Sequence, residues 1–248
     1  MNICLFTSDE INKPLSFSDE RAQHLIKVLH KKEGETFKAG IVDGRAGSAT
    51  ITCINRDEKN ISFTFQAEED GKPLYHLTMI IGFPRPIQLK RLLRDMAGLG
   101  LEEIHLTATE LTEKSYLKSD LASPQSCYKM LLDGTVQAGG THVPAIYMHF
   151  SLRECLDSLQ EKISCCQNLF CLDNIDASDS LNHRLLSAPA PLSAIAAIGS
   201  ERGWTTDERN LFEEKGFSRL RMGSRIFRTE TAATVAASLI LARMGKLE

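Results

Sequence analysis

The hydrophobic and polar residues in the first third of the chain follow the pattern of short β-strands joined by tight turns. β-Branched and aromatic residues are concentrated in residues 36–42, 48–55 and 61–67. Turn-forming residues separate these runs, with Asp43-Gly44 after the first and residues 57–60 after the second, which predicts an antiparallel meander. A sheet this small must curl or close to bury one face, so the pattern predicts a small β-barrel.

One short helix is predicted before this meander. Ser18 can cap its start, and two acidic residues follow directly in the first turn, where negative charge is favourable. Apolar residues then recur at helical spacing between residues 22 and 29, and Gly34 is expected to end the helix.

Strands begin to alternate with helices beyond residues 66–76, a polar segment that contains Gly and Pro. We therefore expect two domains, over residues 1–70 and 74–248. The buried-strand candidates of the second domain are residues 77–83, 103–107, 168–173 and 194–199, and its helix candidates are residues 88–99, 123–138 and 151–159. This alternation predicts an α/β fold around a parallel sheet.

The last fifty residues contain two glycine-rich loops. The strand candidate 194–199 enters a turn that ends at Gly203, and a capping box over residues 205–208 then starts a helix that Gly216 stops. A second short strand ends at Met222-Gly223, and an Arg-rich loop leads into a closing helix over residues 229–243. Loops at the carboxyl ends of neighbouring parallel strands are the usual ligand site of an open α/β sheet.

Composition and charge narrow the possible partners and compartments. The chain has 29 basic and 32 acidic residues, for a net charge of −3, so a polyanion would have to be bound by a local basic patch. The seven cysteines are scattered, as are the histidines, which predicts reduced thiols and no metal site. No signal-peptide pattern and no apolar run of bilayer length occur, and we expect a cytoplasmic protein without a membrane partner.

Several common active-site motifs are missing from the sequence. It contains no G-x-x-x-x-G-K-[ST] phosphate-binding loop, no G-x-G-x-x-G dinucleotide motif and no G-x-S-x-G nucleophile elbow. Nucleotide hydrolysis, dinucleotide redox chemistry and α/β-hydrolase chemistry are therefore disfavoured.

Taken together, the two glycine loops resemble a known signature. I-G-S-E-R-G-W-T-x-x-E, followed by L-x-M-G-S-R-I-F-R-T-E-T-A, resembles the C-terminal motifs of the 16S ribosomal RNA (uridine-N3) methyltransferase family of the SPOUT superfamily. That family typically reads G-P-E-G-G-x-x-x-x-E and L-G-x-R-I-L-R-T-E-T-A. Residues 23–29 and 112–115 are similar to its H-x-x-R-V-L and S-E-R-S elements.

The resemblance implies a fold, a cofactor and partners. It implies a PUA-like β-barrel over residues 1–70 for RNA, and a SPOUT domain over residues 74–248 whose parallel sheet ends in a C-terminal trefoil knot. The knotted loops would bind S-adenosylmethionine in a homodimer, with the alanine-rich closing helix against the partner, and the substrate would be ribosomal RNA or the small subunit. The implied cofactor contacts are Leu172, Ile198, Gly199, Glu201, Gly203, Met222, Gly223, Ser224, Ile226 and Arg228.

The same resemblance suggests residues for RNA binding and catalysis. Phosphate contacts position RNA without reading its sequence, and the candidates for them are His24, Lys27, Lys31, Arg85, Lys90 and Lys114. Arg228 could stabilise the uracil anion that forms as N3 loses its proton. Glu230 could accept that proton or orient Arg228, or its carboxylate could simply favour the start of the closing helix. Trp204 is interpreted as a packing residue beside the glycine turn.

The sequence also departs from the family pattern. Ser200 and Arg202 stand where the family has Pro and Gly, Gly98 replaces a Glu, Lys114 replaces an Arg, and residues 136–140 lack an E-Q-x-x-R stretch. These departures keep two alternatives open. The protein could be a SPOUT paralogue that methylates another RNA position, or a non-catalytic RNA-binding module in ribosome assembly.

Overall fold

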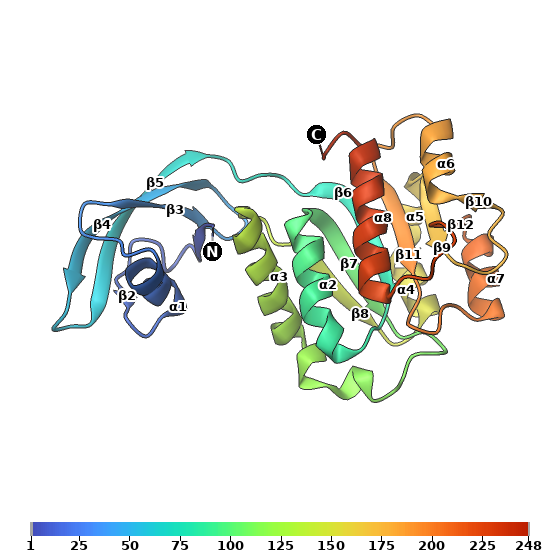
Figure 1. Cartoon of the computed structure of the whole chain (residues 1–248), viewed down its shortest axis with the longest axis horizontal. Coiled ribbons are helices and arrows are strands. Elements are labelled where there is room, and N and C mark those ends of the chain that lie inside the picture. Colours follow the sequence, from blue (N-terminus) through green and yellow to red (C-terminus); the bar gives the residue numbers. More distant parts are fainter. Residues whose placement is uncertain (1, 248) are drawn as a thin grey trace. The chain divides into compact units, whose positions relative to one another are not determined.

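The computed structural model describes residues 2–247, which form two compact units (Figure 1). The first unit holds the chain through Pro73 together with Thr135–Val143, and the second holds Leu74–Gly134 and the chain from Pro144 onward. The return of the chain to the first unit was not foreseen from the sequence. It is fixed by hydrogen bonds around Asp43, whose backbone N–H donates to the carbonyl of Thr141 (2.9 Å) and whose carboxylate accepts from the N–H of Val143 (2.9 Å).

A five-stranded curled sheet forms the body of the first unit. Its strands are β1 (Cys4–Phe6), β2 (Leu15–Ser16), β3 (Thr36–Ile41), β4 (Ala46–Asn55) and β5 (Asn60–Glu69), in the order β1-β3-β4-β5-β2. The antiparallel pairing of β3, β4 and β5 confirms the predicted meander. Two register shifts between β4 and β5 add twist to the sheet. The short strands β1 and β2 were missed because two or three residues carry no periodic signal.

The predicted helix of the first unit is shorter than expected and of two types. It consists of α1 (Glu20–Gln23) and a π-helical turn, His24–Val28. Its cap is Asp19, not Ser18, because the Asp19 carboxylate accepts from the N–H of Arg21 at 2.8 Å. The helix ends before His30, whose φ of 51° is incompatible with a right-handed helix, so the predicted end at Gly34 was wrong.

The second unit is built on a seven-stranded sheet in which every neighbouring pair is parallel. Its strands are β6 (Tyr75–Gly82), β7 (Leu101–Thr107), β8 (Ala145–His149), β9 (Leu169–Leu172), β10 (Asp179–Ser180), β11 (Ala194–Ile198) and β12 (Ser218–Arg221), in the order β10-β12-β9-β11-β6-β7-β8. The parallel α/β prediction is confirmed. The two edge strands, β8 and β10, were missed because β10 has only two residues and β8 is a short strand whose residues are mostly half-exposed.

Helices cover both faces of this sheet (Figure 1). They are α2 (Pro86–Gly98), α3 (Pro124–Ala138), α4 (Leu152–Ser158), α5 (Gln160–Cys165), α6 (Leu181–Ser187), α7 (Thr206–Glu214) and α8 (Thr229–Arg243), with 3₁₀ turns at Tyr116–Lys118 and Asp120–Ala122. The helices α4, α5 and α7 pack on one face through a shared apolar core. The helices α2 and α8 contact each other, and α8 lies against β6 and β11. No helix within residues 2–247 is long and apolar enough to cross a membrane.

The alanine-rich face of α8 is buried within the chain itself. Ala232, Ala233, Ala236 and Ala237 are all less than 9% exposed, and the helix packs on α2, β6 and β11. Small side chains allow this close approach of helix to sheet. The expectation that this alanine face contacts a partner subunit is therefore wrong, because the face is already covered.

Candidate functional site

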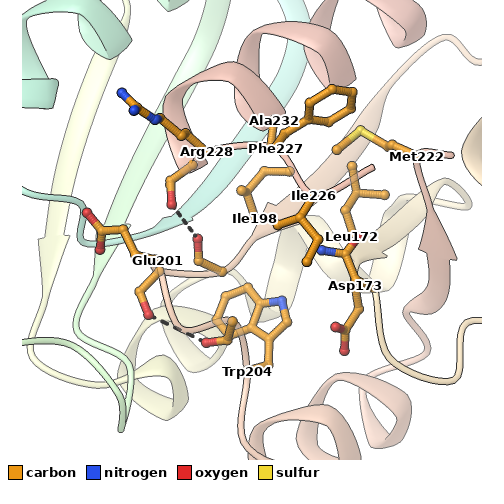
Figure 2. A pocket seen from close by; sticks show the side chains of 15 residues that line it. Leu172, Asp173, Ile198, Glu201, Trp204, Met222, Ile226, Phe227, Arg228 and Ala232 are labelled. Carbon is orange, nitrogen blue, oxygen red and sulfur yellow. Dashed lines mark hydrogen bonds between the residues drawn. The ribbon is translucent and has the colours of Figure 1, made fainter. Parts of the chain in front are cut away.

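A pocket opens where β9, β11 and β12 end, and we call it the loop pocket (Figure 2). Its volume is about 300 Å³. Three loops and the first turn of α8 form its wall, because the carboxyl ends of these neighbouring parallel strands meet at one edge of the sheet. The lining residues are Leu172, Asp173, Asn174, Ile198, Gly199, Ser200, Glu201, Gly203, Trp204, Met222, Ile226, Phe227, Arg228, Thr229 and Ala232.

The loop after β11 presents bare backbone to the pocket. It turns back on itself through a hydrogen bond from the N–H of Gly203 to the carbonyl of Ser200 (2.9 Å), and Gly203 has a φ of 73°. A Cβ atom at Gly199 would lie 2.9 Å from the Cα of Gly203. Two glycines are therefore required here, one for close approach and one for a left-handed conformation.

Hydrogen bonds to other elements hold this loop in place. The backbone N–H of Arg85, at the start of α2, donates to Oε1 of Glu201 at 2.8 Å. The Thr229 hydroxyl donates to the carbonyl of Gly199 at 3.3 Å. Ser200 and Thr109 join their hydroxyls at 3.2 Å, a bond that the proline typical of the family pattern cannot make. The loop is thus fixed before any ligand binds.

The pocket wall is largely apolar and includes the chain's single tryptophan. Trp204 is 2% exposed and packs edge-to-face on Phe212, with ring centroids 4.8 Å apart, which agrees with its predicted packing role. Within residues 2–247 its indole N–H has no hydrogen-bond partner. A buried unpaired donor costs about 1–3 kcal/mol, so the site lacks an acceptor that a ligand of the pocket could provide.

Asp173, directly after β9, brings a buried negative charge to the pocket. Nε of Arg209 lies 2.5 Å from its Oδ2 atom, and the N–H of Ile175 donates to Oδ1 at 3.2 Å. The hydrogen bond from Arg209 to Asp173 raises the pKa of the arginine. The carboxylate is therefore paired and fixed in direction.

Arg228 and Glu230 flank the start of α8 in different environments. Arg228 is exposed at the pocket rim, and among residues 2–247 its guanidinium forms no ion pair or hydrogen bond. Figure 2 shows it directed away from the apolar wall of Leu172, Ile198 and Ile226. Glu230 is 5% exposed in the first turn of α8 and does not line the pocket.

Comparison with known proteins assigns the second unit. A sequence profile for the RNA methyltransferase domain matches residues 70–241, a span that includes all three loops of the pocket. The chain belongs to this RNA methyltransferase family.

Named relatives of the family match over nearly the whole chain. The ribosomal RNA small subunit methyltransferase E of Treponema pallidum is 41% identical over 254 residues, which cover 98% of this chain and 91% of that protein. The ribosomal RNA small subunit methyltransferase E 1 of Borreliella burgdorferi is 35% identical over 245 residues, 98% of each chain. The crystal structure of a ribosomal RNA small subunit methyltransferase E from Neisseria gonorrhoeae, bound to S-adenosyl methionine, has the same fold, with a TM-score of 0.76, 21% identity and coverage of 98% and 97%.

The structure brings most of the residues implied for the cofactor of this family to the loop pocket. Eight of the ten line it, while Gly223 and Ser224 lie exposed in the loop after β12 without lining it. Seven lining residues were not predicted, namely Asp173, Asn174, Ser200, Trp204, Phe227, Thr229 and Ala232. Asp173 could have been found from the sequence, since it ends a predicted strand at the ligand-binding edge of the sheet.

The residues implied for RNA binding are divided between the two units. Lys27 and Lys31 line a second cavity in the first unit, described below as the basic groove, whereas Nε2 of His24 is buried without a hydrogen-bond partner among residues 2–247. In the second unit Arg85 precedes α2, Lys90 is exposed on α2, and Lys114 is exposed before the first 3₁₀ turn.

Two histidines that are distant in sequence meet in the second unit. Nδ1 of His105 lies 2.9 Å from Nε2 of His149, and the ring planes differ by 5° with centroids 5.2 Å apart. The two nitrogens therefore face each other in the plane of the rings, the geometry of a hydrogen bond. Burial lowers the pKa of His105 to about 4. Cys155 lies close by, but the prediction that the protein holds no metal is left untested.

Proposed function

We propose that this protein transfers a methyl group from S-adenosylmethionine to N3 of a uridine in the 16S ribosomal RNA of the small subunit. The observation that carries the proposal is the loop pocket itself, a rigid glycine-lined cavity at the carboxyl ends of β9, β11 and β12. It lies in a chain whose relatives in Treponema pallidum and Borreliella burgdorferi are named as small subunit ribosomal RNA methyltransferases. We further propose a trefoil knot in these loops, a PUA-like barrel in residues 1–70, and action in the cytoplasm.

The residues of the pocket fit the proposed cofactor. Backbone groups of Gly199 and Gly203 can read the polar edge of an adenine, because no side chain keeps a base at a distance. The apolar side chains of Leu172, Ile198 and Ile226 can hold its faces, and the indole N–H of Trp204 would gain its missing acceptor. S-adenosylmethionine supplies a methyl group already activated by its sulfonium.

Arg228 and Glu230 would then serve the RNA side of the reaction. N3 of uracil becomes nucleophilic when it loses its proton, and the exposed, unpaired guanidinium of Arg228 at the pocket rim is suited to stabilise the resulting anion. Glu230 lies outside the pocket lining, and its place in the first turn of α8 supports the helix-stabilising role over proton transfer.

Cofactor binding can be measured without any RNA. Trp204 is the only tryptophan of the chain and lines the pocket, so its fluorescence should change on titration with S-adenosylmethionine, in agreement with calorimetry. A protein that binds no S-adenosylmethionine by either method would be a non-catalytic module, and the proposed activity would be wrong.

The RNA product tests the specificity. Mass spectrometry of 16S ribosomal RNA should detect a methyl group on N3 of one uridine in cells with the protein and not in cells without it. Methylation at another nucleotide or at a ribose would identify a paralogue with a different target. We note that Arg202 is 70% exposed at its side chain beside the pocket, within 4.0 Å of Glu113, where the family has no arginine.

Substitutions separate the two proposed side-chain roles. Arg228→Ala should reduce the methylation rate by orders of magnitude while cofactor affinity changes little, since the guanidinium acts on charge that forms in the reaction. Glu230→Gln keeps the shape and removes the charge, so it should lower stability slightly and leave the pH dependence of the rate unchanged. Near-normal turnover of Arg228→Ala on assembled subunits would exclude its catalytic role.

We also propose that the active form is a homodimer. Ile226 is 83% exposed and Phe227 36% exposed beside the loop pocket, and apolar side chains so placed are typical of a covered surface. With the alanine face of α8 already buried, these two residues are the proposed contact. Light scattering should show a dimer at micromolar concentration, and Ile226→Asp should shift it toward monomer.

A further inference from the structure

The basic groove is a cavity of about 910 Å³ that lies entirely within residues 17–59 of the first unit. Its floor is apolar, formed by Phe17, Ile26 and Ile54, which are half-buried and pack on the core of the sheet. Positively charged side chains surround this floor, namely Lys27, Lys31, Lys32, Arg56 and Lys59. The groove therefore offers an apolar surface within a ring of cations.

The charges around this groove are unbalanced. Among residues 2–247, none of its five cations forms an ion pair or a side-chain hydrogen bond. The only acidic residue in the lining is Glu33, whose carboxylate accepts from the backbone N–H of Ile54 at 2.7 Å. Five close cations repel one another, so the arrangement fits a polyanionic ligand.

The backbone around the groove is held in a defined shape. The π-helical turn His24–Val28 places Ile26 and Lys27 on the groove, and π-helical turns are frequent at functional sites. The next loop is tied down by two hydrogen bonds, from the N–H of Lys32 to Glu35 (2.6 Å) and from the N–H of Gly34 to the carbonyl of Ile51 (2.8 Å). The floor and the backbone that carries the lysines are thus preformed, while the charged ends have no ion-pair partner among residues 2–247.

We infer that the basic groove binds unpaired nucleotides of RNA, with a base on the apolar floor and the adjoining phosphates on the cations. The inference rests on the proposed function only in that RNA is the substrate. In duplex RNA the bases are stacked inside and only phosphates and riboses are presented, so the floor would stay uncovered. An unpaired base exposes its flat faces, which stack on apolar side chains while cations hold the backbone.

The test measures binding of the full-length protein to two labelled RNAs of equal charge, an unstructured pyrimidine 12-mer and a fully paired blunt-ended duplex, by fluorescence anisotropy. The wild-type protein should bind the 12-mer about tenfold more tightly. Ile26→Ala, which shortens the floor, should lower affinity for the 12-mer about tenfold, and should leave both the affinity for the duplex and the salt dependence unchanged.

Substitutions at the rim should behave in the opposite way. Lys27→Gln combined with Lys31→Gln should weaken both RNAs and lower the slope of log affinity against log salt by about 1.4, the value for two phosphate contacts on a single strand. Lys38→Gln is the matched control, because Lys38 is exposed on β3 and does not line the groove. Circular dichroism and S-adenosylmethionine binding, read by Trp204, should be unchanged in every variant.

Several outcomes would overturn the inference. Equal affinity for the two RNAs, or a floor substitution without effect on the 12-mer, would show a site for phosphates alone. If the rim variants bound both RNAs as tightly as the wild-type protein but no longer bound an acidic peptide, the groove would be a site for a protein partner. If Ile26→Ala alters the circular dichroism, Phe17→Leu gives the same test with smaller volume change. If the wild-type protein bound the 12-mer through the floor but did not methylate 16S ribosomal RNA, the proposed reaction would be refuted and the inference about the groove would stand.

Discussion

The loop pocket and the basic groove are built in opposite ways. Around the pocket the two carboxylates are fixed, since Glu201 accepts from the start of α2 and Asp173 is paired with Arg209. Around the groove the cations are unpaired within the described part of the chain, and only the backbone and the floor are fixed. A small cofactor that binds in one conformation is bound more tightly by groups that are already in place. A flexible polyanion needs only unpaired cations around an apolar surface on which a base can stack.

This difference predicts different responses to substitution. The pocket depends on close contacts between backbone atoms, so a side-chain atom added at one of its glycines should remove nearly all cofactor binding. The groove depends on a sum of charges and one apolar surface, so single substitutions should act in small steps. The following experiments test this contrast, beginning with the largest expected effect.

Gly199→Val should eliminate cofactor binding. The added Cβ would meet Gly203 Cα at 2.9 Å, so the loop must move away from its bound shape, and we expect affinity to fall at least about 1,000-fold, or about 4 kcal/mol. Calorimetry with S-adenosylmethionine measures the loss. Gly98→Ala is the control, because nothing lies within 4 Å of a Cβ at that position. Cofactor affinity within tenfold of wild type would mean that the pocket is flexible and the contrast with the groove is wrong.

Arg209→Ala should have the next largest effect, on stability. It leaves the carboxylate of Asp173, whose side chain is 5% exposed, without its partner, and loss of one member of a buried ion pair typically costs about 3–5 kcal/mol. Urea unfolding followed by circular dichroism measures the change. The double variant Arg209→Ala with Asp173→Asn should recover part of it. No recovery would show that Arg209 acts by packing and not by charge.

Some of these features are visible in the sequence and others are not, for a physical reason. The glycine loops and Arg228 form continuous motifs, so their place at the ends of strands follows from local pattern. The pair of Asp173 and Arg209 joins residues 36 apart in sequence, and Arg56 and Lys59 reach the groove only because β4 and the turn after it pass beside the π-helical turn. The return of Thr135–Val143 to the first unit is likewise a tertiary event without a local signal.

Acidification should weaken the two units in different pH ranges. The folded pKa of His105 is lowered to about 4 by burial, from an ordinary value of 6.5, so protons bind the unfolded chain first as the pH falls between these values. Stability should drop by about 2 kcal/mol between pH 6.5 and pH 5. In the first unit, hydrogen bonds from Arg21 lower the pKa of Glu10 and Asp19 below their ordinary values of 4.5 and 3.8. The stability that these two carboxylates contribute is therefore lost only at lower pH.

Thermal unfolding at pH 6.5 and pH 5 tests this ordering. His105→Asn should flatten the pH dependence over this range, and the exposed His183→Asn should not. A wild-type protein equally stable at both pH values would show that the folded pKa of His105 is not lowered from its ordinary value.

Glu201→Gln should have the smallest effect, a small loss of cofactor affinity, because it removes only the negative charge of a side chain that holds the loop after β11. Helix α2 has no side-chain cap of its own, and the Glu201 carboxylate fills that role from a distant loop by accepting from the N–H of Arg85 at 2.8 Å. Glutamine keeps an acceptor oxygen but loses the negative charge that the helix N-terminus favours, worth about 0.3–1 kcal/mol. We expect cofactor affinity to fall about threefold in Glu201→Gln and about tenfold in Glu201→Ala, which loses the acceptor as well.

Glu214→Gln, at the exposed end of α7, is the control. Equal effects of Gln and Ala would mean that charge, not the hydrogen bond, fixes the loop, and the pocket would then share the electrostatic character of the groove.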